Sequence, residues 1–359
     1  MLAKPALSAS LDQFEAVAFE PKWDGFRCLA FHLSDGIVLQ GRGRSRSSDP
    51  HHPEGIVDLG YAFPEVVGAV AECTRVGTVL DAEIVVQVGG RLDFPALSSR
   101  LRPRAASGAR TIAALSDRLP ATLLAFDLLA QGTALLDAPF AERRRRLQDL
   151  APRWSRGLRL TPSTEDPRAA GDWFTDYESA GVDGLLVKPL GDPYQPGKRA
   201  QWKVKHRRTA DLVVAGWRPQ VAKDGVEVVG SLLLGAYDHD GLLHYLGGTG
   251  ALTQVARRAL RADLARYALG PGDDHPWLGD SGARAPGGAS RWGPGKAWHA
   301  VVPALVAEVD YDQLEGTRFR HPAAFMRWRP DRDPRSCGFD QFPASSPNEI
   351  GGLLGWAAP

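Results

Sequence analysis

An amine, two carboxylates and a guanidinium lie within eight residues near the start of the chain. The stretch is Glu20-Pro-Lys22-Trp-Asp24-Gly25-Phe-Arg27, which contains the pattern K-x-D-G-x-R. Only eight of the 43 basic residues are lysine, so a lysine at this position is unlike the rest of the chain. An arginine guanidinium stays charged, whereas an amine can lose its proton and attack an electrophile. Lys22 is therefore a candidate nucleophile.

Two further lysines stand close together in Trp202-Lys203-Val-Lys205. Side chains alternate between the two faces of an extended strand, so Lys203 and Lys205 share one face. Both amines can therefore reach a single anionic group.

Apolar runs and turn signals in the first two hundred residues predict strands and hairpins with helices between them. A short strand is expected at Ala16–Phe19, with Lys22 in the loop that follows it. Hairpin turns are expected at Ser34-Asp35-Gly36 and at Gly89-Gly90. Helical character is expected over Pro139–Leu150 and Asp166–Ala180.

The second half begins with a fresh set of short strands after residues 206–210. A helix is expected at Leu252–Leu269, a long loop at Pro271–Pro294 and a returning strand at Ala297–Tyr311. Several short strands with one helix indicate a small closed barrel such as an OB-fold. The fold class is α+β, with one domain over residues 1–208, a barrel over 209–345 and a tail over 346–359.

Charge is unevenly distributed, although the net charge is only +1. Basic clusters occur at Arg143–Arg146, Lys198–Arg208 and Arg318–Arg335, and they favour a polyanionic partner. The first of these is expected on a helix as a solvated or phosphate-contacting surface. Paired histidines, His51 and His52, have no third ligand at a suitable spacing, so a solvated loop is the favoured interpretation.

Targeting features are not apparent. Residues 1–14 lack the pattern of a signal peptide, and no apolar run is long enough to span a bilayer. Cys28, Cys73 and Cys337 lack the C-x-x-C spacing of a zinc site or a disulfide framework. A cytoplasmic monomer without membrane contact is expected.

Taken in order, these motifs resemble the covalent nucleotidyltransferase superfamily of DNA ligases, RNA ligases and capping enzymes. The similarity runs from Glu20 to Pro334 and is strongest to ATP-dependent DNA ligases of the small bacterial C type. It implies an ATP-grasp-like nucleotidyltransferase domain of antiparallel sheets and helices, followed by an OB-fold barrel. It further implies ATP as AMP donor and Mg²⁺ or Mn²⁺ as the metal.

The resemblance assigns roles to particular residues. Lys22 matches the nucleophile that attacks the α-phosphate of ATP, and Lys203 and Lys205 match lysines that contact this phosphate. Asp24 would orient the acceptor hydroxyl or a nearby metal. Residues that match ATP contacts in the first half of the chain are Glu20, Arg27, Arg42, Glu83, Phe126 and Arg199.

The remaining matches concern the metal and pyrophosphate, and three positions depart from the family pattern. Asp183 and Glu83 match metal-holding carboxylates, although most of the family has glutamate where Asp183 stands. Arg329 and Arg332 match the final ligase motif, where Arg332 replaces the usual lysine. Gly41 precedes Arg42 where serine is common, so Arg44 is an alternative to Arg42.

The resemblance implies that the protein seals nicks in duplex DNA during DNA repair. It also implies a location at the nucleoid of a bacterial cell. DNA would be held mainly through its phosphates, with a repair polymerase or repair complex as a possible partner. An RNA ligase, a capping guanylyltransferase and a non-catalytic nucleic-acid-binding protein are the alternatives. Intact Lys22, Asp24, Glu83, Lys203 and Lys205 argue against the non-catalytic alternative.

Overall fold

Strand pairing and core packing divide the chain into two units, each described separately. The computed structural model describes residues 1–6, 10–42, 57–101, 108–154, 157–250, 252–270, 272–278, 286, 297–342 and 349–354. The first unit comprises Met1–Lys205 with Ser345–Pro359, and the second comprises His206–Ala344. The end of the chain thus groups with the first unit, whereas the sequence suggested a separate tail from residue 346. Each helix among the described residues is too short or too polar to cross a bilayer.

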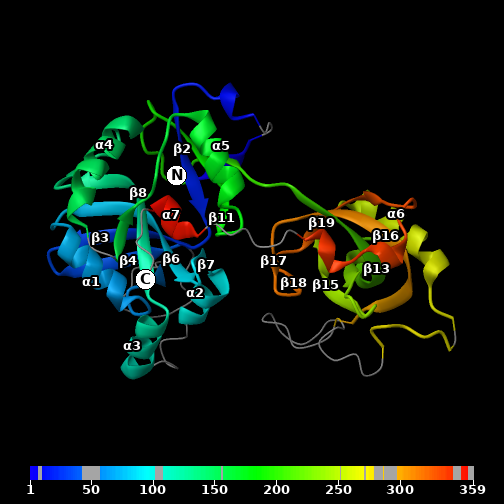
Figure 1. Ribbon diagram of the computed structural model, residues 1–359. Coiled ribbons are helices and arrows are strands. Elements are labelled where there is room, and N and C mark those ends of the chain that lie inside the picture. Colours follow the sequence, from blue (N-terminus) through cyan, green and yellow to red (C-terminus); the bar gives the residue numbers. More distant parts are fainter. Residues whose placement is uncertain are drawn as a thin grey trace. The chain divides into compact units, whose positions relative to one another are not determined.

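A small sheet of the first unit contains β2 and β11, the strands of Lys22 and Asp183 (Figure 1). Its strands follow the order β1-β12-β11-β2. Strand β2 pairs antiparallel with β11, and β11 pairs antiparallel with β12. The bounds are β1 (Ala3–Pro5), β2 (Val17–Trp23), β11 (Val182–Pro189) and β12 (Gln201–Val204).

A larger sheet of the first unit supplies the side chains that face the small sheet. Its strands follow the order β10-β8-β6-β3-β4-β5, with β7 added to β6 and β9 added to β8. The predicted hairpins are present, with Gly36 and Gly90 at positive φ in their turns. The bounds are β3 (Phe26–Leu33), β4 (Gly36–Gly41), β5 (Val57–Asp58), β6 (Thr78–Val88), β7 (Arg91–Leu92), β8 (Ala121–Gln131), β9 (Thr133–Ala134) and β10 (Leu158–Leu160).

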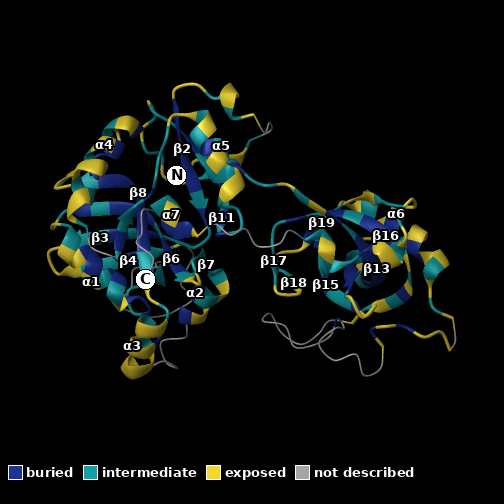
Figure 2. Cartoon of the chain, in the orientation of Figure 1, coloured by how far each residue is buried: buried dark blue, intermediate teal, exposed yellow. Residues whose placement is uncertain are grey.

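Helices cover both sheets, and their starts follow ordinary capping rules. Asp93 and Asp166 each accept a backbone N–H at the N-cap, and a proline follows within two residues, which begins α2 and α5. Buried strands lie beneath partly exposed helices (Figure 2). The bounds are α1 (Pro64–Cys73), α2 (Phe94–Arg100), α3 (Ala109–Arg118), α4 (Phe140–Leu150), α5 (Pro167–Asp176) and α7 (Ile350–Leu354).

The second unit is a five-stranded closed barrel in the order β13-β14-β15-β19-β16. Along the chain, helix α6 lies between β15 and β16, and its Leu260 and Leu264 join the barrel core. This is the OB-fold that the sequence predicted. The bounds are β13 (Arg208–Val221), β14 (Glu227–Tyr237), β15 (Leu243–Gly250), α6 (Gln254–Leu264), β16 (His299–Tyr311), β17 (Leu314–Glu315), β18 (Arg318–Phe319) and β19 (Ala323–Trp328).

Two arginines of α4 correct the expectation of a solvated basic surface. Arg143 is fully buried, and its Nε and Nη2 lie 2.8 and 3.0 Å from the two carboxylate oxygens of Asp127. Arg144 is also buried, and it donates to the carbonyl of Thr161 at 2.5 Å. Helical spacing points these side chains at β8 and its neighbours, and only Arg145 meets the expectation of an exposed side chain.

Loss of the buried Arg143 guanidinium should be strongly destabilising. Arg143→Ala leaves the Asp127 carboxylate buried without its partner, so we expect a loss of about 3–5 kcal/mol in the free energy of unfolding. Arg145→Ala on the same helix breaks only an exposed pair with Asp149 and should cost under about 0.5 kcal/mol. Urea denaturation of both variants checks this, and equal losses would contradict it.

Candidate active site

Lys22 lies on β2, near its end, and not in a loop after a shorter strand as the sequence suggested. The strand continues to Trp23 because its final residue still pairs with Val182 of β11. The Lys22 amine forms an ion pair with the carboxylate of Asp183. Lys205 Nζ lies 3.0 Å from the same Asp183 oxygen. The candidate nucleophile, one predicted phosphate-binding lysine and one predicted metal ligand therefore meet at one carboxylate.

Close backbone approach explains the glycine of the K-x-D-G pattern. A Cβ on Gly25 would come within 2.3 Å of the carbonyl oxygen of Ile84 and within 2.8 Å of the Glu83 side chain. The glycine thus lets the turn after Lys22 lie against β6. Burial is the main cause that raises the pKa of Glu83 to about 8, and the charges of Asp81 and Asp24 act in the same direction.

Phe126 and Glu20 lie on facing strands of the two sheets and are joined by one buried lysine. The Lys188 amine lies 4.5 Å from the centre of the Phe126 ring and forms an ion pair with Glu20. Arg144 approaches the other Glu20 oxygen at 3.5 Å. Burial raises the pKa of Glu20, against the opposing effect of these two cations. An aromatic face and a buried carboxylate thus lie together, as a purine site requires.

Arg27 is fixed by a second buried acid. Its Nε lies 2.9 Å from Asp81 Oδ1, and Tyr194 donates its hydroxyl to Asp81 Oδ2 at 2.7 Å. The guanidinium lies 5.6 Å from the centre of the Phe126 ring. Arg27 therefore borders the same aromatic side chain as Lys188 and has a fixed orientation.

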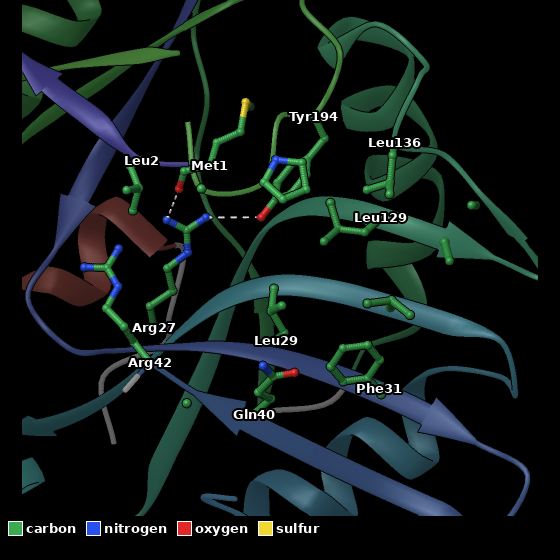
Figure 3. A pocket seen from close by; sticks show the side chains of 16 residues that line it. Met1, Leu2, Arg27, Leu29, Phe31, Gln40, Arg42, Leu129, Leu136 and Tyr194 are labelled. Atoms are coloured by element: carbon green, nitrogen blue, oxygen red, sulfur yellow. Dashed lines mark hydrogen bonds between the residues drawn. The ribbon is translucent and has the colours of Figure 1, made fainter. Parts of the chain in front are cut away.

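A pocket of about 490 Å³ opens beside Arg27 (Figure 3). Arg27 and Arg42 line it together with Tyr194 and apolar side chains of β3, β6 and β8, whereas Lys22 does not line it. Arg42 is exposed at this pocket and Arg199 is exposed in the segment before β12. The candidates Arg44, His51 and His52 lie outside the described residues.

The carboxylates near Lys22 suit a metal that also binds phosphate. Among the described residues, no group of three potential ligands forms a preformed metal site. Mg²⁺ commonly takes one or two protein carboxylates and completes its coordination with water and substrate phosphates. Asp183 and Glu83 supply hard oxygen donors of this kind, so the donor set fits a metal that arrives with a nucleotide.

The two arginines of the final motif lie in the barrel and share one acid. Arg329 Nη1 lies 3.0 and 2.9 Å from the two Asp211 oxygens, and its Nη2 lies 2.8 Å from Asp331. Arg332 Nε lies 3.9 Å from Asp211. The Gln341 side chain bonds both the N–H and the carbonyl of Asp211, which fixes this acid in place.

Comparison with known proteins identifies the family. The family described as "ATP dependent DNA ligase domain" matches residues 1–205, and "ATP dependent DNA ligase C terminal region" matches residues 226–332. DNA ligase C2 of Mycolicibacterium smegmatis is 42% identical over 349 residues, covering 94% of this chain and 93% of that protein. DNA ligase C of Mycobacterium tuberculosis is 42% identical over 354 residues, covering 95% and 92%. The chain belongs to the family of ATP-dependent DNA ligases.

Other relatives agree with this assignment. The multifunctional non-homologous end joining DNA repair protein LigD of Mycobacterium tuberculosis is 31% identical over 323 residues, covering 88% of this chain and 36% of that protein. A solved structure of a Lig E DNA ligase matches with a TM-score of 0.53 and 16% identity, covering 91% of this chain and 98% of that one. The latter likeness concerns the fold alone, and the predicted α+β ligase architecture with an OB-fold is confirmed.

Several residues of the ligase site were not singled out in the sequence. Lys188, Arg144 and Asp81 contact the predicted residues, but each is a charged side chain that is buried. Charged residues are seldom buried, so composition argues against placing them inside. Lysine is scarce in this chain, and this scarcity was the one signal in the sequence that could have marked Lys188 as a site residue.

Glu83 should make the stability of the ligase depend on pH. The folded protein keeps the Glu83 proton up to about pH 8, whereas the unfolded chain releases it near the ordinary value of 4.5. Unfolding therefore becomes easier as pH rises through this window, by at most about 1.4 kcal/mol per pH unit. Glu83→Gln should remove this dependence. Urea denaturation in EDTA at pH 5 to 8 checks it, and parallel curves for the two proteins would exclude the effect.

Proposed function

We propose that this ligase seals nicks in duplex DNA through a covalent lysyl-AMP intermediate on Lys22. The observation that carries the proposal is the Lys22 amine held at the Asp183 carboxylate, with Lys205 3.0 Å from the same oxygen. An amine, a proton-accepting carboxylate and a second cation are what in-line attack on a phosphoanhydride requires.

In the first step, Lys22 Nζ forms a bond to the α-phosphorus of ATP. The bond between that phosphorus and the bridging oxygen to the β-phosphate breaks, and pyrophosphate leaves. Asp183 lies where it can take the proton that the amine must lose. Lys203 and Lys205 would neutralise the charge that develops on the α-phosphate oxygens. Mg²⁺ or Mn²⁺, held by Asp183 and Glu83, would reduce the charge repulsion between the phosphates and the nucleophile.

Recognition of the adenosine would use the buried layer between the sheets. Phe126 offers a ring for the base to stack on, and Glu20 offers an acceptor for its exocyclic amino group. Arg27 and Arg199 would contact the nucleotide, and Glu83 its ribose. Arg144 and Lys188 hold Glu20 in place, so the acceptor is oriented before the nucleotide arrives.

AMP would then pass to the 5′-phosphate at a nick, and the 3′-hydroxyl, oriented by Asp24, would displace it. Arg42 is exposed and suits a contact with the 5′-phosphate. DNA is expected to bind through its phosphates, so affinity should fall steeply with salt and show little sequence preference. The relative named as a DNA repair protein supports a role in repair, in concert with a polymerase or repair complex.

Label transfer from α-labelled ATP tests the nucleophile. After a denaturing quench, the wild type should carry label in the presence of Mg²⁺ or Mn²⁺. Lys22→Ala and Lys22→Arg should carry none, because neither side chain offers a nucleophilic amine. Lys223→Ala, at an exposed turn, is the control and should label normally. Labelling from GTP in place of ATP would favour a capping enzyme, and label on both Lys22 variants would refute the assignment.

Arg329 should matter for the first step more than for the last. We propose that Arg329 and Arg332 contact the departing pyrophosphate, which is absent when a pre-adenylylated nick is sealed. Arg329→Ala should therefore lower the rate of self-adenylylation by about 100-fold or more and leave sealing of pre-adenylylated nicks within severalfold of normal. Arg327→Ala, two residues earlier near the end of β19, is the control. Equal loss of both steps in Arg329→Ala would contradict the proposal.

A further inference from the structure

The last helix of the described chain, α7, packs against the strands that carry Lys22 and Asp183 (Figure 1). Ile350 is fully buried in a cluster with Trp23 and Val182. Leu353 and Leu354 pack against the same cluster. The backbone N–H of Ile350 donates to the carbonyl of Gly90 at 2.8 Å. This helix lies outside residues 1–205 and 226–332, which match the two family descriptions.

Strand geometry places this contact directly behind the reacting groups. Trp23 and Val182 are paired residues of β2 and β11, and they are the sequence neighbours of Lys22 and Asp183. Successive side chains on a strand point to opposite faces. The amine and carboxylate therefore meet on one face, while Trp23 and Val182 turn to the other, where α7 covers them.

The fit of α7 to this surface is close and specific. Gly90 has a φ of +77°, and a Cβ there would come within 2.6 Å of the Glu349 side chain. A Cβ on Gly352 would approach the Tyr177 hydroxyl at 3.2 Å. Trp23 is further fixed by a bond from its Nε1 to Thr161 at 3.0 Å. A larger side chain at Gly90 or at Gly352 would thus crowd the opposing surface, so both surfaces allow close packing at this contact.

We infer that residues 349–354 position the adenylylation site by fixing the backbone at Trp23 and Val182, and with it the geometry of Lys22 against Asp183. The inference rests on the proposed role of Lys22 as the nucleophile. Ile350 is then a positioning residue that acts through its two neighbours and does not touch substrate. The second unit is also joined to the first at both of its ends, because the chain leaves at Lys205 and returns to pack at Ile350.

Ile350→Asp tests this while it keeps the chain full length. A carboxylate cannot replace Ile350 among these apolar side chains, so α7 should detach. The single-turnover rate of lysyl-AMP formation at saturating ATP should fall by about tenfold or more, because small displacements of reacting groups are costly. The single-turnover rate should fall, whereas the ATP concentration for half-saturation should stay unchanged. Ile350→Val keeps an apolar side chain and should therefore keep the wild-type rate. Val255→Asp is the matched control, because Val255 is 80% exposed on α6.

A second measurement separates positioning from general stability. Sealing of pre-adenylylated nicks does not use the Lys22 amine, so its rate should stay within severalfold of normal in both Ile350→Asp and Val255→Asp. Normalising rates to the folded fraction removes any effect of lower stability, and Leu353→Ala gives a milder variant if Ile350→Asp does not fold. A folded variant with α7 released, shown by protease cleavage near residue 349, would overturn the inference if it formed lysyl-AMP at the normal rate or lost both steps equally. An unlabelled wild type would instead refute the proposed function.

Discussion

The ion pair between Lys22 and Asp183 is the interaction on which the arrangement of the first unit depends. It joins the ends of β2 and β11, and the approach of Lys205 to the same oxygen brings in the end of β12. One carboxylate thus gathers three strands of the small sheet around a reactive amine. In the proposed attack on ATP, the same carboxylate is the nearest acceptor for the proton that the amine loses.

A layer of paired charges between the two sheets sets the surroundings of that amine. Glu20 lies against Lys188 and Arg144, Arg143 against Asp127, and Arg27 against Asp81. Buried ion pairs add little net stability, because removing charges from water is costly. Their benefit is orientation, since fixed dipoles and charges need no reorganisation when a nucleotide enters. We therefore interpret this layer as binding-site structure more than as core.

The candidate reactive residues could be proposed from the sequence because they stand in short motifs with a fixed spacing. Alternation and turn residues also predicted the hairpins and the barrel, since these are local patterns. Three features had no local signal. Lys22 was expected in a loop because the apolar run ends at Phe19, although pairing with β11 extends β2 to Trp23. The burial of Arg143 and the docking of α7 depend on partners 16 residues and more than 160 residues away.

The barrel shows how a departure from the family pattern can be accommodated. Asp211 binds the Arg329 guanidinium through both of its oxygens and lies 3.9 Å from Arg332. A lysine at position 332 would be a compact charge with a strong hold on its hydration, whereas the planar guanidinium shares an acid and still presents N–H groups to a second anion. Arg332 Nη2 already donates to the Ser336 carbonyl at 3.2 Å. Because both arginines are oriented by one fixed acid, the exchange of lysine for arginine keeps two cations in a defined position, as the proposed contact with the departing pyrophosphate requires.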